Sequence, residues 1–327
     1  MCKLSAVREG VFEVLLSGRF DARERDDWLH ALRGAAPDFR WWSDGDAELD
    51  RAAIGAAVVA NPAPGALLGM PNLRLVQSLW AGVDRLLDDG SLPPEVPLAR
   101  MVDPVLGAAM AETALWAVLS LQRGYFDYAA QQREGVWQQH AQRRAEDVRV
   151  LVLGLGQMGR TVAARLAAQG HAVSGWRGAS ACDRPAPSRV AVHAGAAALD
   201  GLLPASDIVV NLLPLTAATR GLLDARFFAR MRRSASLVNL ARGAHVIDDD
   251  LLAALDSGQL RRAVLDVFAA EPLPAGHRYW RHPRVTVLPH VAALTDRHSA
   301  AQVVAANLRA VRDGTPLVHR VDRARGY

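Results

Sequence analysis

The sequence predicts an α/β protein built from two doubly wound domains with a cleft between them. Three observations support this prediction. Short runs rich in Val and Leu alternate with helical segments along most of the chain, which is the pattern of parallel sheets. A glycine-rich turn at 154–159 joins one such run to a helix. The length of 327 residues exceeds what one hydrophobic core usually supports.

The first hundred residues alternate short strands and helices before a proline-rich break. The segments expected there are 11–16, 25–35, 56–59, 73–78 and 98–101. The sequence Leu-Pro-Pro-Glu-Val-Pro at 92–97 ends this section, because proline interrupts both helices and ladders. A long apolar-periodic helix at about 107–128 then leads into the second domain.

The middle of the chain predicts a Rossmann-like sheet. Strands are expected near 148–153, 171–176, 207–211, 235–240 and 263–267, with helices between them. A helix from about 296 to 312 follows and is expected to return to the first section. We therefore expect a substrate domain at 1–100 plus 293–327 and a dinucleotide domain at 101–292.

The loop Gly154-Leu-Gly-Gln-Met-Gly159 has the spacing of a phosphate-binding turn. Gly154 suits the tight turn, Gly156 lets the backbone approach a pyrophosphate, and Gly159 lets the helix pack against the strand. Free amides and the positive end of the helix dipole would hold the phosphates. The loop lies between a strand and a helix, which is the context that this motif requires.

The end of the second strand bears on the choice of cofactor. An NAD site usually carries Asp or Glu about 20 residues beyond the glycine motif, where it binds the ribose hydroxyls. The segment 171–180 reads HAVSGWRGAS and has no carboxylate. Trp176 and Arg177 stand there, and Arg177 could bind a 2′-phosphate. The sequence favours NADPH, with NADH possible, although a solvated surface arginine is the alternative interpretation.

Composition argues against other classes of protein. The net charge is +4 and the pI about 9.6, yet Lys3 is the only lysine and the arginines are dispersed, so nucleic-acid binding is not expected. We find no apolar stretch of the roughly 18 to 20 residues that a membrane span needs. Cys2 and Cys182 suggest free thiols in a reducing cytoplasm rather than disulfides or a metal site.

Three ionisable residues follow the glycine loop in order. Arg242 lies in VNLARG, Glu271 in DVFAAEPL and His290 in LPHVAA. His290 is the candidate acid/base, because the ordinary pKa of histidine, about 6.5, lies near working pH. Glu271 would fix its tautomer and stabilise the imidazolium. Arg242 offers a planar fork of donors to a carboxylate and a ketone oxygen. This equipment suits hydride transfer to or from a 2-hydroxy or 2-keto acid.

Taken together, these motifs resemble those of the D-isomer-specific 2-hydroxyacid dehydrogenases, and more narrowly those of the glyoxylate/hydroxypyruvate reductase A branch. The segments Asn-Leu-Leu-Pro at 211–214, DDLLAALDSG at 249–258 and VDRARGY at 321–327 resemble that branch as well. The resemblance implies reduction of glyoxylate or hydroxypyruvate in a homodimer paired through 110–137. We further assign to the cofactor site the positions Gln157, Met158, Leu213, Pro214, Leu240, Ala241, Asp266, His290 and Ala292.

The loop SLWAGVD at 78–84 is expected to complete the substrate site. A strand that ends in Ala81 and Gly82 can present bare amides to a carboxylate. In the family this loop binds the substrate acid group through its backbone, but Trp80 stands where the pattern commonly has glycine. Trp80 either lines the pocket or packs in the core or domain interface, and the sequence leaves both open.

Other functions on the same scaffold remain as alternatives. Phosphoglycerate, lactate and formate dehydrogenases share it, although the chain shows no extra regulatory domain of the larger phosphoglycerate enzymes. NAD(H)-binding corepressors would need a partner-binding groove or additional tails, which we do not find. An inactive homologue would be expected to lack one of Arg242, Glu271 and His290, and all three are present.

Overall fold

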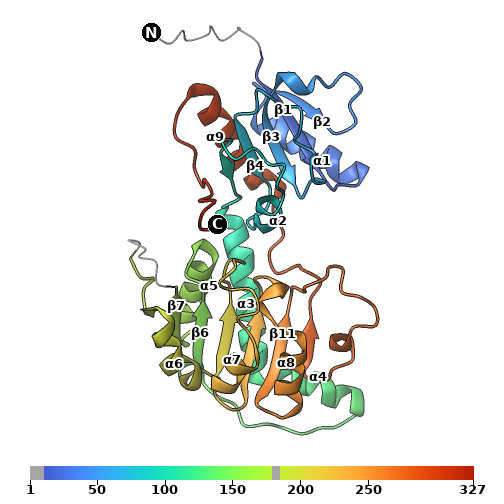
Figure 1. Ribbon diagram of the computed structural model, residues 1–327. Helices are drawn as coiled ribbons and strands as arrows, with labels where there is room; N and C mark the ends of the chain where they lie inside the picture. The colour runs from blue at the N-terminus through green and yellow to red at the C-terminus, as the bar shows by residue number, and fades with distance from the viewer. Residues whose placement is uncertain (1–10, 179–184) are drawn as a thin grey trace. The chain divides into compact units, whose positions relative to one another are not determined.

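The structure is a computed structural model that describes residues 11–178 and 185–327 (Figure 1). The chain divides into two compact units. Unit 1 comprises Met1–Val105 and Thr295–Tyr327, and unit 2 comprises Leu106–Leu294. The two boundaries therefore lie after residues 105 and 294. The sequence predicted them after residues 100 and 292. Both cysteines and Lys3 lie outside the described residues, as do Ala179 and Ser180 at the end of the segment used to predict the cofactor.

Unit 1 contains, in its described part, one five-stranded parallel sheet. Its strands are β1 (Glu13–Gly18), β2 (Arg40–Ser43), β3 (Ile54–Ala60), β4 (Leu75–Ser78) and β5 (Leu98–Ala99). The order β2-β1-β3-β4-β5 is the flavodoxin-like doubly wound order. All seven residues of central β3 are buried, because a strand covered on both faces must be apolar throughout.

The helices of unit 1 come from both ends of the chain. They are α1 (Ala22–Ala35), the short α2 (Asp84–Leu87) and α9 (Arg297–Asp313). Helices α1 and α9 pack against each other although they are far apart in sequence (Figure 1). The Arg309 guanidinium, 3.0 Å from the Asp38 carboxylate, holds the pKa of Asp38 at about 2 together with Arg312. The last helix, α9, thus packs on the N-terminal part of the chain, as the sequence predicts.

Unit 2 is built, over its described residues, on a seven-stranded parallel sheet. Its strands are β6 (Arg149–Leu153), β7 (Ala172–Arg177), β8 (Val190–Ala194), β9 (Ile208–Asn211), β10 (Ala235–Asn239), β11 (Leu260–Leu265) and β12 (Val285–Val287). The order β12-β11-β10-β9-β6-β7-β8 reverses direction between β6 and β9. Counted from β6, it is the strand order of dinucleotide-binding sheets, so the predicted doubly wound fold is confirmed.

Helices cover both faces of this sheet. They are α3 (Pro104–Arg123), which begins at the end of unit 1, α4 (Tyr125–Glu134), α5 (Gln157–Ala168), α6 (Ala196–Ala205), α7 (Ala225–Arg230) and α8 (Asp248–Asp256). One hydrophobic cluster joins α3 and α5 to one face, and a second joins α6, α7 and α8 to the other. Helix α5 directly follows the glycine-rich turn, where the sequence predicts a helix.

The strands that the sequence analysis missed all lie at sheet edges. Strand β2 borders one edge of the sheet of unit 1, and β8 and β12 are the two edges of the sheet of unit 2. An edge strand is partly exposed, so it needs fewer apolar residues than a central strand. The three residues of β12, for example, are all only half-buried. Their apolar pattern is correspondingly too weak to stand out in the sequence.

The single helix predicted at 107–128 is wrong in one respect. Helix α3 ends at Arg123, and α4 begins after Gly124, whose φ of 71° lies in the left-handed region. A residue in that conformation interrupts the helical hydrogen-bond ladder, and glycine adopts it without a Cβ clash. The result is a break between two helices where the apolar pattern runs on.

The chain does contain one apolar stretch of the length of a membrane span, contrary to the prediction from the sequence. Helix α3 is 20 residues long and apolar enough to cross a membrane by length and composition alone. Half of that apolar stretch is buried within the protein, with Met110, Val118 and Leu121 packed against Val150 and Val162. This is the packing of a core helix, whose alanines made the stretch look less apolar than it is.

Candidate active site

The glycine-rich loop between β6 and α5 has a distinct geometric reason for each glycine. Gly154 has φ 92°, and a Cβ there would lie 2.6 Å from the Leu212 carbonyl oxygen. A Cβ on Gly159 would lie 1.7 Å from the Gly154 carbonyl oxygen, so any side chain would separate helix from strand. Around Gly156, in contrast, no described atom lies within 4 Å of that position. The loop is closed toward the protein and open at Gly156.

The first turn of α5 can receive an anion. Gly156 is the N-cap residue, and no side chain in the described part of the chain caps the helix there. The first amide groups of a helix have no partner within it, and the helix dipole favours negative charge at this end. Gln157 and Met158 begin this turn, and the Met158 side chain packs partly on the core. These residues fit the phosphates of a dinucleotide.

Strand β7 ends at Trp176 and Arg177, beside the glycine loop. The Trp176 side chain is buried in the core near Leu199 and Leu203, and its indole N–H donates to the Gly195 carbonyl at 2.8 Å. Its carbonyl accepts the Gly154 amide, also at 2.8 Å. Trp176 therefore supports the loop through its backbone, and its assignment to the cofactor site stays a prediction. Arg177 is half-buried at the strand end.

Arg242 lies in the loop after β10, which approaches the loop after β11 very closely. A Cβ on Gly243 would lie 1.9 Å from the carbonyl carbon of Phe268. Glycine is consequently the only residue that allows these two loops to pack in this way. The Arg242 side chain is half-buried, and its Nη1 donates to the Ala241 carbonyl at 2.8 Å. The close approach holds Arg242 next to the segment that carries Glu271.

His290 and Glu271 form the hydrogen-bonded pair that the sequence predicts. His290 Nδ1 lies 2.8 Å from Glu271 Oε2, and the other carboxylate oxygen accepts the Phe268 amide at 2.9 Å. A carboxylate only accepts, so Nδ1 carries a proton and donates it. The His290 side chain is 52% exposed and that of Glu271 22%. The pair therefore presents the imidazole Nε2 at the surface of unit 2 with its ring orientation fixed.

Asp266 orders the backbone on both sides of His290. Its carboxylate accepts the amides of Val291 and Ala292 at 2.8 and 3.0 Å, and its carbonyl accepts the His290 amide. Burial raises the pKa of Asp266, whereas the two amides act in the opposite direction. The Ala292 carbonyl accepts from Thr113 of α3 at 2.8 Å. Asp266 thus shapes the His290 loop, and its assignment to the cofactor site stays a prediction.

The loop at the end of β4 supplies the site residues of unit 1. The amides of Ala81 and Gly82 donate to no acceptor within the described part of the chain. The Trp80 amide donates to Ser78 Oγ at 3.0 Å, and its carbonyl accepts the Met101 amide at 3.0 Å. Two amides are therefore available to a carboxylate on a loop that is anchored on both sides.

The Trp80 side chain packs on Trp28 of α1. The ring centroids are 6.3 Å apart and the planes meet at 79°, an edge-to-face contact. Trp28 is buried, whereas Trp80 is partly exposed. The indole of Trp80 thus has one face held by the core of its own unit. Its role in substrate binding stays a prediction.

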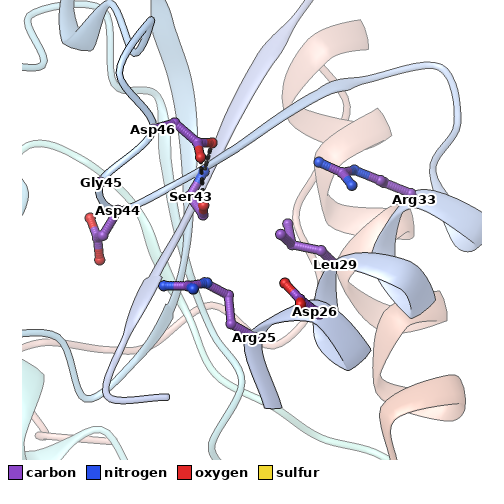
Figure 2. Close-up of a pocket in the computed structure, with 8 residues that line it drawn as sticks. All are labelled: Arg25, Asp26, Leu29, Arg33, Ser43, Asp44, Gly45 and Asp46. Atoms are coloured by element: carbon purple, nitrogen blue, oxygen red, sulfur yellow. Dashed lines mark hydrogen bonds between the residues drawn. The ribbon is translucent and has the colours of Figure 1, made fainter. Parts of the chain in front are cut away.

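Unit 1 also contains a polar hollow away from these residues. The hollow has a volume of about 440 Å³. Figure 2 shows its lining side chains on α1 and on the loop after β2. It is lined by Arg25, Asp26, Leu29, Arg33, Ser43, Asp44, Gly45 and Asp46. Asp46 already accepts from the amide and the hydroxyl of Ser43. None of the predicted site residues lies here, and its opposite charges largely balance.

The site residues of unit 2 share one edge of the sheet. The glycine loop, Arg242, Glu271 and His290 follow β6, β10, β11 and β12, and parallel strands end at the same edge. Leu213 and Pro214 follow β9, and Leu240 and Ala241 follow β10. The sequence analysis missed Asn211, Asn239 and His245, which are buried at this edge. Polar residues that end apolar strands were the signal that could have revealed the first two.

A dinucleotide-binding sheet with a histidine–carboxylate pair at the carboxyl ends of its strands defines a nicotinamide-dependent dehydrogenase. Comparison with known proteins agrees. Residues 115–292 match the NAD binding domain of the D-isomer specific 2-hydroxyacid dehydrogenases. The chain belongs to this family.

Named relatives and solved structures align with nearly the whole chain. The glyoxylate/hydroxypyruvate reductase A of Yersinia enterocolitica is 36% identical over 93% of this chain and 97% of that protein. The NADPH-dependent glyoxylate/hydroxypyruvate reductase of Sinorhizobium meliloti, solved with NADP and sulfate, is 36% identical over 97% of this chain and 100% of that chain, with a TM-score of 0.89. A D-isomer specific 2-hydroxyacid dehydrogenase of Xanthobacter autotrophicus, solved with NADPH and MES, is 38% identical with the same coverage and a TM-score of 0.91.

Proposed function

We propose that this protein is an NADPH-dependent reductase that converts glyoxylate to glycolate and hydroxypyruvate to D-glycerate. The observation that carries the proposal is the 2.8 Å hydrogen bond between His290 Nδ1 and Glu271 Oε2, at the strand ends of a dinucleotide-binding sheet. Relatives from two bacteria, 36% and 38% identical, are named glyoxylate/hydroxypyruvate reductase A. Their identity and coverage favour this activity over others on the same scaffold.

Proton transfer is assigned to His290. With Nδ1–H donated to Glu271, the protonated imidazole offers its Nε2–H to the carbonyl oxygen of the 2-keto acid. Glu271 stabilises the imidazolium before transfer and keeps the ring in place afterwards. NADPH, when bound, supplies the hydride that reaches the carbonyl carbon. The 2-keto acid, NADPH and one proton thus yield the 2-hydroxy acid and NADP⁺.

The substrate carboxylate is assigned to Arg242 and to the amides of Ala81 and Gly82. A guanidinium forms paired charge-assisted hydrogen bonds with a carboxylate, and backbone amides add donors of fixed direction. The substituent on C2 would then point toward the remaining side chains, including Trp80. Glyoxylate has only hydrogen at this place and hydroxypyruvate a hydroxymethyl group, so both are small enough for a site bounded by an indole.

The preference for NADPH is assigned to Arg177. It ends β7, where an NAD site would carry a carboxylate, and its charge would attract the 2′-phosphate. Structures of relatives with NADP or NADPH bound support this preference. Arg177→Asp should reverse it, because a carboxylate repels the phosphate and can accept the ribose hydroxyls. The ratio of kcat/KM for NADPH to that for NADH measures the change, and an unaltered ratio would remove Arg177 from this role.

The activity is tested by following NADPH oxidation with four acids. Glyoxylate, hydroxypyruvate, pyruvate and phosphohydroxypyruvate should be supplied at equal concentrations to the purified protein. We expect the first two to give the highest kcat/KM. A clear preference for pyruvate would indicate a lactate-type enzyme, and one for phosphohydroxypyruvate a phosphoglycerate-type enzyme. Binding of NADPH without turnover of any acid would favour a binding protein over an enzyme.

We also infer that the protein forms a homodimer through unit 2. We further infer that it is located in the cytoplasm. Helices α3 and α4 and the segment after them carry several exposed apolar side chains, namely Trp116, Tyr125, Val136 and Trp137. Trp137 is 96% exposed. Exposed apolar groups gathered on one segment commonly mark an interface. The two cysteines, interpreted as free thiols, favour a reducing cytoplasm, which cell fractionation would test.

Helix α4 holds one of these side chains, the Trp116 ring of α3, in place. Asp127 forms ion pairs with Arg261 and Arg262 of β11, and the Arg262 guanidinium lies 5.2 Å from the Phe126 ring. Phe126 in turn contacts Trp116 edge-to-face at 5.7 Å. The Trp116 ring is consequently held in place rather than left as a loose surface group, which reduces the loss of conformational entropy on binding.

A further inference from the structure

Three polar side chains are completely buried where two neighbouring strands end. Asn211 is the last residue of β9, Asn239 is the last residue of β10, and His245 ends the short turn that follows Arg242. Burying polar groups is costly unless they are hydrogen-bonded, so their partners are informative. The three residues bond to one another and to the backbone of the loops on either side.

Backbone groups fix the orientation of both asparagines. Asn239 Oδ1 accepts the Ala241 amide at 3.2 Å, and its Nδ2 donates to the Arg242 carbonyl at 3.0 Å. Asn211 Oδ1 accepts the Leu213 amide at 3.2 Å. An amide N–H only donates and a carbonyl only accepts, so neither side chain can be turned around. Each asparagine therefore holds a loop through a bond of known direction.

The protonation state of His245 follows from these directions. Asn211 Nδ2 donates to Asn239 Oδ1 at 3.0 Å and to His245 Nδ1 at 2.9 Å. Nδ1 must therefore accept, which leaves the proton on Nε2. That nitrogen lies 3.2 Å from the Pro214 carbonyl oxygen and donates to it. His245 is thus a neutral imidazole that links the loop after β9 to the loop after β10.

We propose that His245 is a positioning residue that, with Asn211 and Asn239, holds the cofactor loop at 212–216 and the Arg242 loop at 240–245 in one arrangement. The network ties the backbone of Leu213 and Pro214 to that of Arg242 through side chains that are completely buried. Its role rests on the proposed function, because these loops are the proposed cofactor and substrate contacts. Loosening it should weaken both binding steps together.

The test compares His245 with a second buried histidine of unit 2. His171 is also buried, and its ring nitrogens pair with the Leu166 carbonyl and with Gln122. It directly precedes β7, at the opposite edge of the sheet from the strand ends. His245→Leu and His171→Leu should both lower the melting temperature. Only His245→Leu should change ligand binding.

We expect His245→Leu to raise both the Kd for NADPH and the KM for glyoxylate, each by about tenfold, because two buried hydrogen bonds are lost. The His171→Leu variant should stay within about threefold of the parent protein, as its lost bonds lie elsewhere. Both are measured at least ten degrees or so below the lower melting temperature. Equal effects of the two substitutions on Kd and KM would overturn the proposal and leave a structural role only.

Conservative substitutions keep the test decisive if His245→Leu fails to fold. His245→Gln retains an acceptor and a donor at similar reach and should restore Kd and KM to within about threefold of the parent values. His245→Asn is polar but too short to reach both partners, so it should remain impaired. Equal behaviour of the Gln and Asn variants would count against the network. Selective ¹⁵N-histidine NMR offers a direct check: a His245 ring protonated at Nδ1 would contradict it.

The Kd for NADPH separates this proposal from the proposed reductase function. If the parent protein reduces neither glyoxylate nor hydroxypyruvate, the assigned activity is wrong, but NADPH binding by the His245 and His171 variants can still be compared by fluorescence. A selective loss in His245→Leu would then support the network. If His245→Leu bound NADPH normally and had an unchanged KM for glyoxylate, the proposed role of the network would be refuted, even if the parent protein is a fully active reductase.

Discussion

At the scale of the residue, the candidate acid/base occupies an uncommon backbone conformation. His290 has φ 55°, in the left-handed region where most side chains are strained. The surroundings hold it there: its amide donates to the Asp266 carbonyl, and the Asp266 carboxylate accepts the next two amides. The ring is then held by Glu271. Strain of this kind is found where a site needs one orientation of a side chain.

His290→Gln should remove most turnover while leaving NADPH affinity near that of the parent protein. Glutamine cannot transfer a proton near neutral pH, and general acid–base groups contribute about 10² to 10⁴-fold to rate. Steady-state kcat and the NADPH Kd measure the two effects. His290→Asn serves as a second variant, since asparagine tolerates a positive φ well. Full kcat in either variant would show that another group transfers the proton.

Trp80→Gly should enlarge the range of substrates at some cost in stability. If the indole lines the pocket, its removal admits larger 2-keto acids such as phenylpyruvate and loosens the small ones. Loss of the contact with Trp28 should also lower the free energy of unfolding, by less than the roughly 3 kcal/mol of a buried Trp truncation, because Trp80 is partly exposed. The kcat/KM for glyoxylate and for phenylpyruvate, with melting temperatures, measures both.

Trp41→Leu is a matched control for this prediction. Trp41 is buried in the same unit, and its indole donates to the Ala36 carbonyl at 3.1 Å, away from the loop at 78–84. It should lose stability without a change in the order of substrates. If Trp80→Gly behaves in the same way, Trp80 is a packing residue and substrate range is decided elsewhere.

At the scale of the element, buried polar contacts determine how helices attach to the sheet of unit 2. His171 precedes β7, and its two ring nitrogens lie 3.2 Å from the Leu166 carbonyl of α5 and 2.8 Å from Gln122 Oε1 of α3. Burial lowers the pKa of His171, with the Leu166 carbonyl acting in the opposite direction. The attachment of two helices to this strand consequently depends on a histidine that is neutral when folded.

His171 should make unit 2 less stable in mild acid. An exposed histidine in the unfolded chain binds a proton near pH 6.5, while the folded residue resists it, so the unfolded state holds more protons below that pH. Stability is therefore full above about pH 6.5 and falls as the pH drops toward the lowered pKa. Denaturant unfolding at pH 7.5 and 5.5 measures this. The decrease should be smaller in His171→Gln, and an equal decrease would assign it to other groups.

At the scale of the whole molecule, the exposed aromatics of α3, α4 and the following segment predict self-association. Light scattering of the parent protein should give the mass of a dimer at micromolar concentration. Trp137→Ser should shift this equilibrium toward monomer, because Trp137 is the most exposed of these side chains. Trp280→Ser, at a half-exposed tryptophan elsewhere in unit 2, is the control and should leave the mass unchanged. A fully active parent monomer would disprove the dimer.

Much of the fold follows from the sequence alone because its central strands are fully covered. Strands such as β3, β6 and β9 consist almost wholly of buried apolar residues, so local composition identifies them. The glycine loop and the order of Arg242, Glu271 and His290 are likewise local signals, since each residue type is required by its own chemistry. These features place the site at the strand ends before any tertiary contact is known.

The tertiary structure decided whatever depends on neighbours distant in the chain. The edge strands β8 and β12 have only five and three residues, too few for a distinct periodic pattern, and each pairs with one neighbouring strand. The side chain of Trp176 could have faced a cofactor, but packing against Leu199 and Leu203 placed it in the core. The bonds that join Asn211, Asn239 and His245 span 28 and 34 residues. Sequence periodicity does not predict such contacts, because residues this far apart form hydrogen bonds only after the folded chain has brought them together.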